Sequence, residues 1–295
     1  MIIDTHLHVW ELHSERYPWQ PLAGVAPDYG WPVESQIEVM DQSGIDKGVL
    51  VQPSMYSFDN RYILDCGWRY PERFRLIGLV DPRADAVESS MESLAERGVR
   101  GLRLGPMLRP DIPWYGDRQA DRVWKRAAEL DMIITLLVTP DQVAPATEAI
   151  KRFPGVRVVI DHLARPDKAD GRHPKADGRH PKADVRHPAD DPGGSQFEDL
   201  LALAQFEQVY VKVSALGFMS HEPYPHRDML ELVRRVFDAF GPERMMWGTD
   251  TPMSQDPATV PDALRLIDIA LPDSSPDDRM QIKGGTAARL FGWIQ

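Results

Sequence analysis

Two histidines, one residue apart, end the first apolar segment of the chain. Ile2 and Ile3 begin a β-type run that finishes in His6 and His8. Residues i and i+2 of a strand point to the same face, so the two imidazoles should project side by side from the strand's end. Imidazoles held in this way form half of a divalent-metal site. The simpler interpretation is that His6 and His8 are only two polar residues at a strand end. Other parts of the chain are needed to distinguish this from a metal site.

Short apolar runs of β type alternate with helical segments along the whole chain. After the first run, seven more follow at 47–52, 75–80, 99–104, 132–138, 156–160, 209–213 and 244–249. Helices are expected at 35–43, 59–70, 85–97, 117–130, 141–153, 195–206, 227–240, 257–270 and 276–291. Several β runs lack polar/apolar alternation, which is typical of strands buried on both faces.

Strict alternation of strands and helices predicts a parallel sheet with right-handed crossovers. Eight units in 295 residues predict a single α/β domain, a (β/α)8 TIM barrel over residues 1–295. A doubly wound open sheet is the alternative. No Gly-x-Gly-x-x-Gly phosphate loop follows the first strand, so a nucleotide-binding fold has little support.

Charge and composition narrow the class of partner. The chain has 45 acidic and 34 basic residues, a net charge of −11, which opposes non-specific binding to nucleic acid or to anionic membranes. Cys66 is its one cysteine, so no intrachain disulfide can form. We find neither a signal-peptide pattern nor a run of 18 apolar residues. We therefore expect a cytoplasmic protein that acts on a small molecule, and leave open whether it forms a homo-oligomer.

In a TIM barrel the carboxyl ends of the strands carry the chemistry. The first strand supplies His6 and His8, the sixth supplies His162, and the eighth leads into Asp250. Three histidines and an aspartate that converge from three strands are hard to explain as structure alone. The other strand ends offer Gln52, Arg103, Lys212 and Ser214.

Two segments stand outside the regular alternation. A Trp- and Pro-rich stretch at 9–32 predicts a long aromatic loop after the first strand, either a surface flap or a wall of the substrate pocket that includes Trp10. At 168–188 the heptad Lys-Ala-Asp-Gly-Arg-His-Pro occurs three times, with Val185 replacing glycine in the last copy. The repeat has no apolar face, so we interpret it as a solvated loop inserted after strand six. Its three histidines leave metal binding as an alternative.

Three motifs together resemble the amidohydrolase superfamily. They are Asp4-Thr-His-Leu-His8, Ile160-Asp-His-Leu-Ala-Arg-Pro166 and Trp247-Gly-Thr-Asp-Thr-Pro252. More narrowly, they are similar to the amidohydrolase-2 branch of metal-dependent TIM-barrel hydrolases, which includes lactonases of sugar acids and of aromatic-degradation pathways. The segments 99–103, 136–140 and 284–291 are also similar to that branch, so the resemblance covers nearly the whole chain except the repeat.

The resemblance implies a metal site, with one departure. Many superfamily members hold two metals with a Lys or Glu from strand four and a His from strand five. Here strand four offers Arg103, and 132–138 contains no histidine. The resemblance therefore implies one divalent ion, expected to be Zn²⁺, on His6, His8 and Asp250, with an open position for water. Some lactonases of the branch are thought to work without metal, so metal-free operation stays open.

The same resemblance implies hydrolysis of a cyclic ester, a lactone. Asp250 is then the base that takes a proton from water and returns it to the leaving oxygen. His6 and His8, with or without metal, polarise the carbonyl, and His162 holds the substrate or its oxyanion. The candidate substrate-binding residues are Arg103, Gln52, Lys212 and Trp10. Arg103 could clamp a carboxylate, although Arg103 and Lys212 could each form a structural ion pair instead.

Two other functions compete with lactone hydrolysis. Related barrels decarboxylate aromatic acids with a metal, but they generally use a strand-five histidine that is missing here. A barrel that only binds a ligand is the third alternative. The intact set of His6, His8, His162 and Asp250 argues against it.

Overall fold

The computed structural model describes residues 1–22, 27–166, 194–254 and 259–294. Eight parallel strands form one sheet in which each strand pairs with the next along the chain. The strands are β1 (Ile3–Leu7), β2 (Lys47–Val51), β3 (Phe74–Gly78), β4 (Val99–Leu104), β5 (Ile133–Leu136), β6 (Val158–Ile160), β7 (Val209–Val213) and β8 (Met245–Trp247). The predicted (β/α)8 barrel is confirmed, and the repeat at 168–188 lies outside the described residues.

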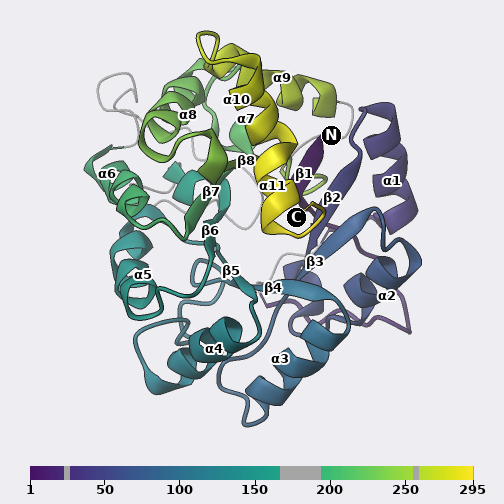
Figure 1. Cartoon of the computed structure of the whole chain (residues 1–295). Helices are drawn as coiled ribbons and strands as arrows, with labels where there is room; N and C mark the ends of the chain where they lie inside the picture. The colour runs from purple at the N-terminus through teal and green to yellow at the C-terminus, as the bar shows by residue number, and fades with distance from the viewer. Residues whose placement is uncertain (23–26, 167–193, 255–258, 295) are drawn as a thin grey trace.

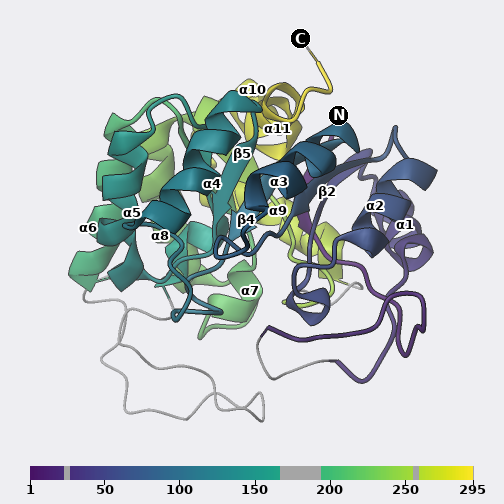
Figure 2. The same cartoon turned by 90° about the horizontal axis from the view of Figure 1, so that it is seen from below.

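Helices surround the strands (Figure 1). They are α1 (Val33–Gln42), α2 (Arg61–Arg69), α3 (Val87–Glu96), α4 (Arg118–Glu129), α5 (Pro140–Arg152), α6 (Gly194–Ala202), α7 (Leu216–Met219), α8 (Arg227–Phe240), α9 (Val260–Ala270), α10 (Pro276–Met280) and α11 (Thr286–Leu290). Figure 2 shows α10 and α11 at one end of the barrel and α7 at the opposite end, to which the carboxyl ends of the strands point. In the described part of the chain, no helix is long and apolar enough to cross a membrane.

The barrel interior changes from apolar to charged along the strands. Near α11 the interior is apolar. Strand side chains and residues of the C-terminal segment form one cluster there, made of Ile3, Val49, Val51, Ile77, Ile133, Val159, Met246, Ala287, Ala288, Leu290 and Phe291. Side chains two residues further along a strand point to the same face. On β5 the step from Ile133 to Thr135, and on β6 the step from Val159 to Asp161, therefore replaces an apolar layer with a polar one, and both polar side chains are fully buried.

The seam between β1 and β8 closes the barrel next to the histidines. The backbone N–H of His8 donates to the Thr251 carbonyl over 2.9 Å, and the N–H of Asp250 donates to the His6 carbonyl over 2.8 Å. Below them, Asp4 accepts hydrogen bonds from the backbone N–H of Thr249 (3.0 Å) and from its hydroxyl (2.6 Å). The chain leaves β8 after Trp247, earlier than the sequence predicted, because residues 248–251 turn toward β1 to make these bonds.

The last predicted helix, 276–291, is present in the structure as one helical segment, but it contains a π-helical turn. The turn, Gln281–Gly285, lies between α10 and α11. Gly284 lies so close to the Met1 carbonyl that a Cβ would overlap it, so the chain has to approach the start of β1 here without a side chain. The short helix α7 was not predicted either, because four residues are too few to show a helical period.

Gly101 provides a test of the barrel packing. A Cβ at this position of β4 would overlap the Ile133 carbonyl oxygen on β5. We expect Gly101→Ala to lower the free energy of unfolding by about 1–3 kcal/mol, as overpacking does. Gly155→Ala is the matched control, since nothing lies within 4 Å of its Cβ position. The measurement is the melting temperature of both variants, and equal melting temperatures would contradict the close approach at Gly101.

Candidate active site

A left-handed turn after β6 brings two adjacent residues into the barrel. Neighbouring residues of a strand point to opposite faces, yet Asp161 and His162 are both buried at the barrel mouth. The reason is the backbone, because residues 162–165 all have φ between 52° and 57°. Four consecutive non-glycine residues in this region are strained, which is common at functional sites.

Both ring nitrogens of His8 face hydrogen-bond acceptors. Nδ1 lies 2.7 Å from the carbonyl oxygen of Val51, and Nε2 lies 3.1 Å from Asp250 Oδ1. The carbonyl can only accept, so Nδ1 carries a proton. A cation is then needed between Nε2 and the carboxylate, either a second ring proton or a metal ion.

The Asp250 carboxylate is the centre toward which the three imidazoles turn. His6 Nε2 lies 3.6 Å from Asp250 Oδ1, and His162 Nε2 lies 4.0 Å from Oδ2. Ser254 donates a short hydrogen bond to the same Oδ2. Burial alone raises the pKa of Asp250, but the surrounding His162, His8 and His6 outweigh burial and lower it below its ordinary value. Asp250 is therefore ionised near neutral pH and can accept a proton.

His162 is held as a neutral ring. Its Nδ1 lies 2.9 Å from the hydroxyl of Ser214, at the end of β7. Burial lowers the pKa of His162 to about 4, despite the nearby carboxylates of Asp250 and Asp161. A neutral imidazole presents one N–H and one lone pair, so the Ser214 contact orients the ring and leaves Nε2 toward Asp250.

Beneath the histidines, Asp161 binds three nitrogen groups. Its carboxylate lies 3.0 Å from Lys212 Nζ, 3.3 Å from Arg103 Nε and 3.6 Å from His6 Nδ1. Burial raises the pKa of Asp161, but Lys212, His6 and Arg103 together hold it well below its ordinary range. Burial lowers the pKa of Lys212, and Asp161 opposes that effect. This web of charges fixes the floor of the site.

A cavity of about 170 Å³ opens above these residues. Its polar wall is formed by His8, Arg103, His162, Arg165, Asp250 and Ser254. The Arg165 guanidinium lies over the ring of Phe218 from α7, 5.2 Å from the ring centre. The cavity therefore joins an ionised carboxylate to two guanidinium groups, with apolar side chains between them.

Three of the predicted substrate-binding residues lie behind the cavity wall. Lys212 is fully buried against Asp161. Gln52 is also fully buried and donates to the carbonyl of Asp59 over 2.7 Å, which holds the loop after β2. Trp10 is buried and donates from Nε1 to the Tyr29 carbonyl over 2.7 Å. Of the predicted substrate-binding set, Arg103 is on the wall in the described structure.

Asp161, Ser254 and Arg165 were given no role from the sequence. Asp161 had the clearest signal, since it precedes His162 at a strand end and shares the face of Val159, but alternation along a regular strand would place it and His162 on opposite faces. Ser254 stands four residues after Asp250 in an irregular segment, where no periodicity predicts contact.

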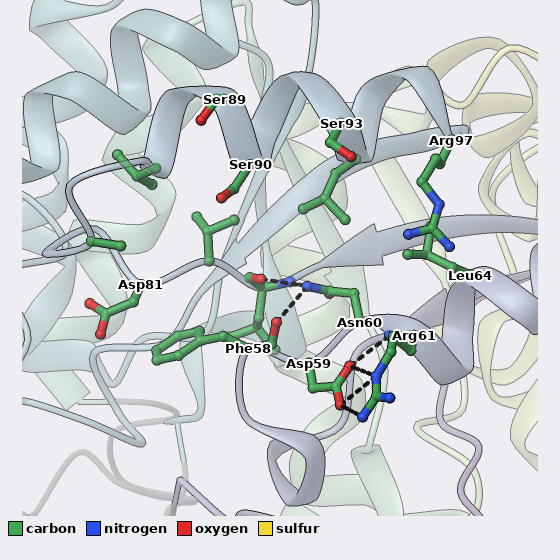
Figure 3. Close-up of a pocket in the computed structure, with 15 residues that line it drawn as sticks. Phe58, Asp59, Asn60, Arg61, Leu64, Asp81, Ser89, Ser90, Ser93 and Arg97 are labelled. Carbon is green, nitrogen blue, oxygen red and sulfur yellow. Dashed lines mark hydrogen bonds and ion pairs between the residues drawn. The ribbon is translucent and has the colours of Figure 1, made fainter. Parts of the chain in front are cut away.

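A larger groove of about 480 Å³ lies between α2 and α3 (Figure 3). The polar groups at its centre are already used: Arg61 binds both oxygens of Asp59, and the Asn60 amide bonds the backbone at Phe58 and Leu79. Because these groups serve the local structure, the barrel mouth is the better candidate for chemistry.

The residues at the barrel mouth fit a divalent metal. Ligand atoms of His6, His162 and Asp250 all lie within 4.8 Å of one another, and His8 Nε2 also lies beside Asp250. Two ligands about 2.1 Å from a tetrahedral zinc ion are about 3.4 Å apart, close to the separations of 3.1–4.0 Å from Asp250. His6 Nε2 is buried without a hydrogen-bond partner, as a free metal ligand would be.

A parallel eight-stranded barrel with imidazoles and a carboxylate at its carboxyl end has the architecture of a TIM-barrel enzyme, whose chemistry lies at that end. The sequence model of the amidohydrolase family (Amidohydro_2) matches residues 3–293, and the chain belongs to this family. The predicted membership of the amidohydrolase-2 branch is thereby confirmed.

Two characterised relatives span most of the chain. An L-fucono-1,5-lactonase from Burkholderia ambifaria is 31% identical over 86% of this chain and 81% of its own length. A 4-sulfomuconolactone hydrolase from Rhizobium radiobacter is 28% identical over 99% of this chain and 90% of its own. These relatives support the assignment of this chain as a hydrolase.

Solved structures share the fold. An amidohydrolase from Burkholderia multivorans with bound zinc superimposes with a TM-score of 0.79 at 19% identity, over 99% of both chains. A 2,6-dihydroxybenzoate decarboxylase from Rhizobium superimposes less well, with a TM-score of 0.66 at 14% identity over 99% of both chains. At this identity the likeness concerns the fold alone.

Asp161→Asn tests the charge web. The change leaves the buried Lys212 without its counter-charge, which typically costs about 3–5 kcal/mol. We expect a loss of that size in the free energy of unfolding, measured by chemical denaturation. Asp131→Asn is the control, because Asp131 pairs with Arg157 at the surface with its side chain 88% exposed. That change should stay within about 0.5 kcal/mol, and a similar small effect at Asp161 would contradict the web.

Proposed function

We propose that this protein hydrolyses a lactone of a sugar acid or of an aromatic-degradation intermediate. The observation that carries the proposal is the Asp250 carboxylate, which lies on the wall of a cavity with two arginines and has imidazole nitrogens of three histidines within 4.0 Å. The lactone-hydrolysing relatives support the same chemistry. Aromatic decarboxylation has less support, because β5 contains no histidine, whereas related decarboxylases generally use one from that strand.

Asp250 serves as the general base. A water molecule adds its oxygen to the lactone carbonyl carbon and gives one proton to the carboxylate. The ring C–O bond then breaks, and the protonated Asp250 returns the proton to the leaving oxygen. The product is the open hydroxy acid, one water heavier than the lactone. Ser254 helps by fixing one carboxylate oxygen.

The imidazoles stabilise the negative charge that develops on the carbonyl oxygen. N–H groups held rigidly in a buried site stabilise an oxyanion without having to reorganise, and His6, His8 and His162 are each at most 4% exposed. When bound by His6, His8 or His162 together with Asp250, a divalent ion, most simply zinc, supplies a Lewis acid for the same carbonyl.

The two arginines of the cavity favour an acidic substrate. A guanidinium can bind a carboxylate through two parallel hydrogen bonds. Arg103 is 5% exposed and Arg165 is 8% exposed, so charge on either is poorly screened by solvent. We therefore propose a lactone that carries a carboxylate or a comparable anionic group beside the ring.

Asp250→Asn tests the base. The amide keeps the shape of the side chain but cannot accept the proton, so kcat should fall by about 10²-fold or more. The assay is acid release from a panel of sugar-acid and aromatic-pathway lactones, with hydroxybenzoates included to detect carbon dioxide release. Asp238→Asn on the exposed face of α8 is the control and should leave kcat unchanged. Full activity of a correctly folded Asp250→Asn protein would rule out the proposed base.

Arg103→Lys tests the anion contact. Lysine keeps a positive charge near Asp161 but loses the two-pronged donor. We expect KM for lactones with a carboxylate to rise by about tenfold, consistent with loss of a charge-assisted hydrogen bond, and KM for neutral lactones to change little. Steady-state kinetics on a matched pair of such lactones is the measurement. An equal change for both members of the pair would show that Arg103 does not recognise the anionic group.

A further inference from the structure

The inner ring nitrogen of His6 lies between groups of opposite charge. Nδ1 is 3.4 Å from Lys212 Nζ and 3.6 Å from Asp161 Oδ1. All three side chains are fully buried, so bulk solvent does not screen the charges. An ammonium only donates hydrogen bonds and a carboxylate only accepts them. The two neighbours therefore favour different tautomers of the His6 ring.

The carboxylate already has two cationic neighbours that are closer than His6. Lys212 lies 3.0 Å from Asp161 Oδ1, and Arg103 Nε lies 3.3 Å from Oδ2. Both contacts are shorter than the 3.6 Å from Asp161 to His6. Lys212 has three N–H donors, so one can serve Asp161 while another points to His6 Nδ1. A proton on Nδ1 would then face the N–H groups of the ammonium.

The outer nitrogen of His6, Nε2, also favours the tautomer in which the ring proton is on Nε2. Nε2 lies 3.6 Å from Asp250 Oδ1 and has no hydrogen-bond partner. A lone pair on Nε2 would face the negative carboxylate, whereas an N–H there is attracted to it. Ser254 donates to the other oxygen, Oδ2, and a carboxylate oxygen has lone pairs to accept from both His8 and His6.

We propose that Lys212 is a positioning residue that donates to His6 Nδ1 and thereby keeps the ring proton on Nε2. His6 then presents an N–H to the Asp250 carboxylate. A metal ion needs the lone pair of Nε2 instead. The ring proton then has to be on Nδ1, where the N–H donates a hydrogen bond to Asp161 and takes the place of the Lys212 donor. Lys212 thus favours His6 as a hydrogen-bond donor over His6 as a metal ligand. The use of that N–H in lactone hydrolysis rests on the proposed function, but the tautomer does not.

The tautomer can be observed in the unaltered protein. Full-length, metal-free protein with ¹⁵N- and ¹³C-labelled histidine is studied by NMR, and correlations between ring nitrogens and ring carbons show which nitrogen carries the proton. The His6 signals are identified from their absence in His6→Gln. We expect the proton on Nε2. A proton on Nδ1 would overturn the proposal without any variant at Lys212 and without an activity assay.

Lys212→Met tests the cause. With the ammonium removed, the Nδ1 proton of His6 can be accepted by Asp161, and Nε2 becomes available to metal. We expect Zn²⁺ affinity to rise by about tenfold or more, the scale on which groups behind a ligand alter metal binding. Competition with a chromophoric chelator measures it. Unchanged or weaker affinity in a folded variant would contradict the role of Lys212, and if the variant does not fold, the NMR result on the unaltered protein decides.

Lys283→Met is the matched control. Lys283 is 9% exposed and its Nζ lies 2.7 Å from both oxygens of Asp268, so it is also a largely buried lysine paired with an aspartate. It belongs to the π-helical turn between α10 and α11, at the opposite end of the barrel from the histidines. Its removal should leave Zn²⁺ affinity and the His6 tautomer unchanged.

Discussion

A buried carboxylate, Asp161, determines how the rest of the site is arranged. A charge without solvent is stable only when it is paired and hydrogen-bonded, and Asp161 is fully buried with Lys212, Arg103 and His6 around it. Each of these partners comes from a different strand. The requirement to compensate one charge therefore ties β1, β4 and β7 to the end of β6, and fixes one side of His6 before any substrate binds.

The closing seam of the barrel fixes the other side. Backbone hydrogen bonds join His8 to Thr251 and Asp250 to the His6 carbonyl, so Asp250 and two imidazoles are linked by the same contacts that close the sheet. Asp250 has a φ of 68°, in the left-handed region, which lets its N–H reach β1 while its carboxylate faces the cavity. Stability and chemical geometry depend on the same few residues here.

The fold could be predicted from the sequence because it repeats a local pattern. Each apolar run and the helix after it is recognisable by itself, and eight of them have few arrangements other than a barrel. The positions of His6, His8, His162 and Asp250 also followed, because strand ends converge in a barrel. What a strand end does not reveal is where its side chain finds a partner.

Gln52 illustrates this limit, since it ends β2 as predicted but is used to hold the backbone of the following loop. Asp161 illustrates the opposite case. It shares the inward face of Val159, but the entry of the adjacent His162 into the same site depends on positive φ at residues 162–165, and no glycine in that segment signals such a turn. The pairing of Asp161 with Lys212 joins distant parts of the sequence through strand register, and local sequence patterns do not encode such a pairing.

The arrangement also explains how one set of residues could serve with or without metal. Around Asp250, a ring proton and a metal ion fulfil the same electrostatic need, which is positive charge between imidazole nitrogens and a carboxylate. At His8 the inner nitrogen donates to a backbone carbonyl, so its outer nitrogen is open to either. At His6 the inner nitrogen faces Lys212, which favours a ring proton over a metal ion on the outer nitrogen. The group behind the ring, more than the ring itself, then determines which chemistry the barrel mouth performs.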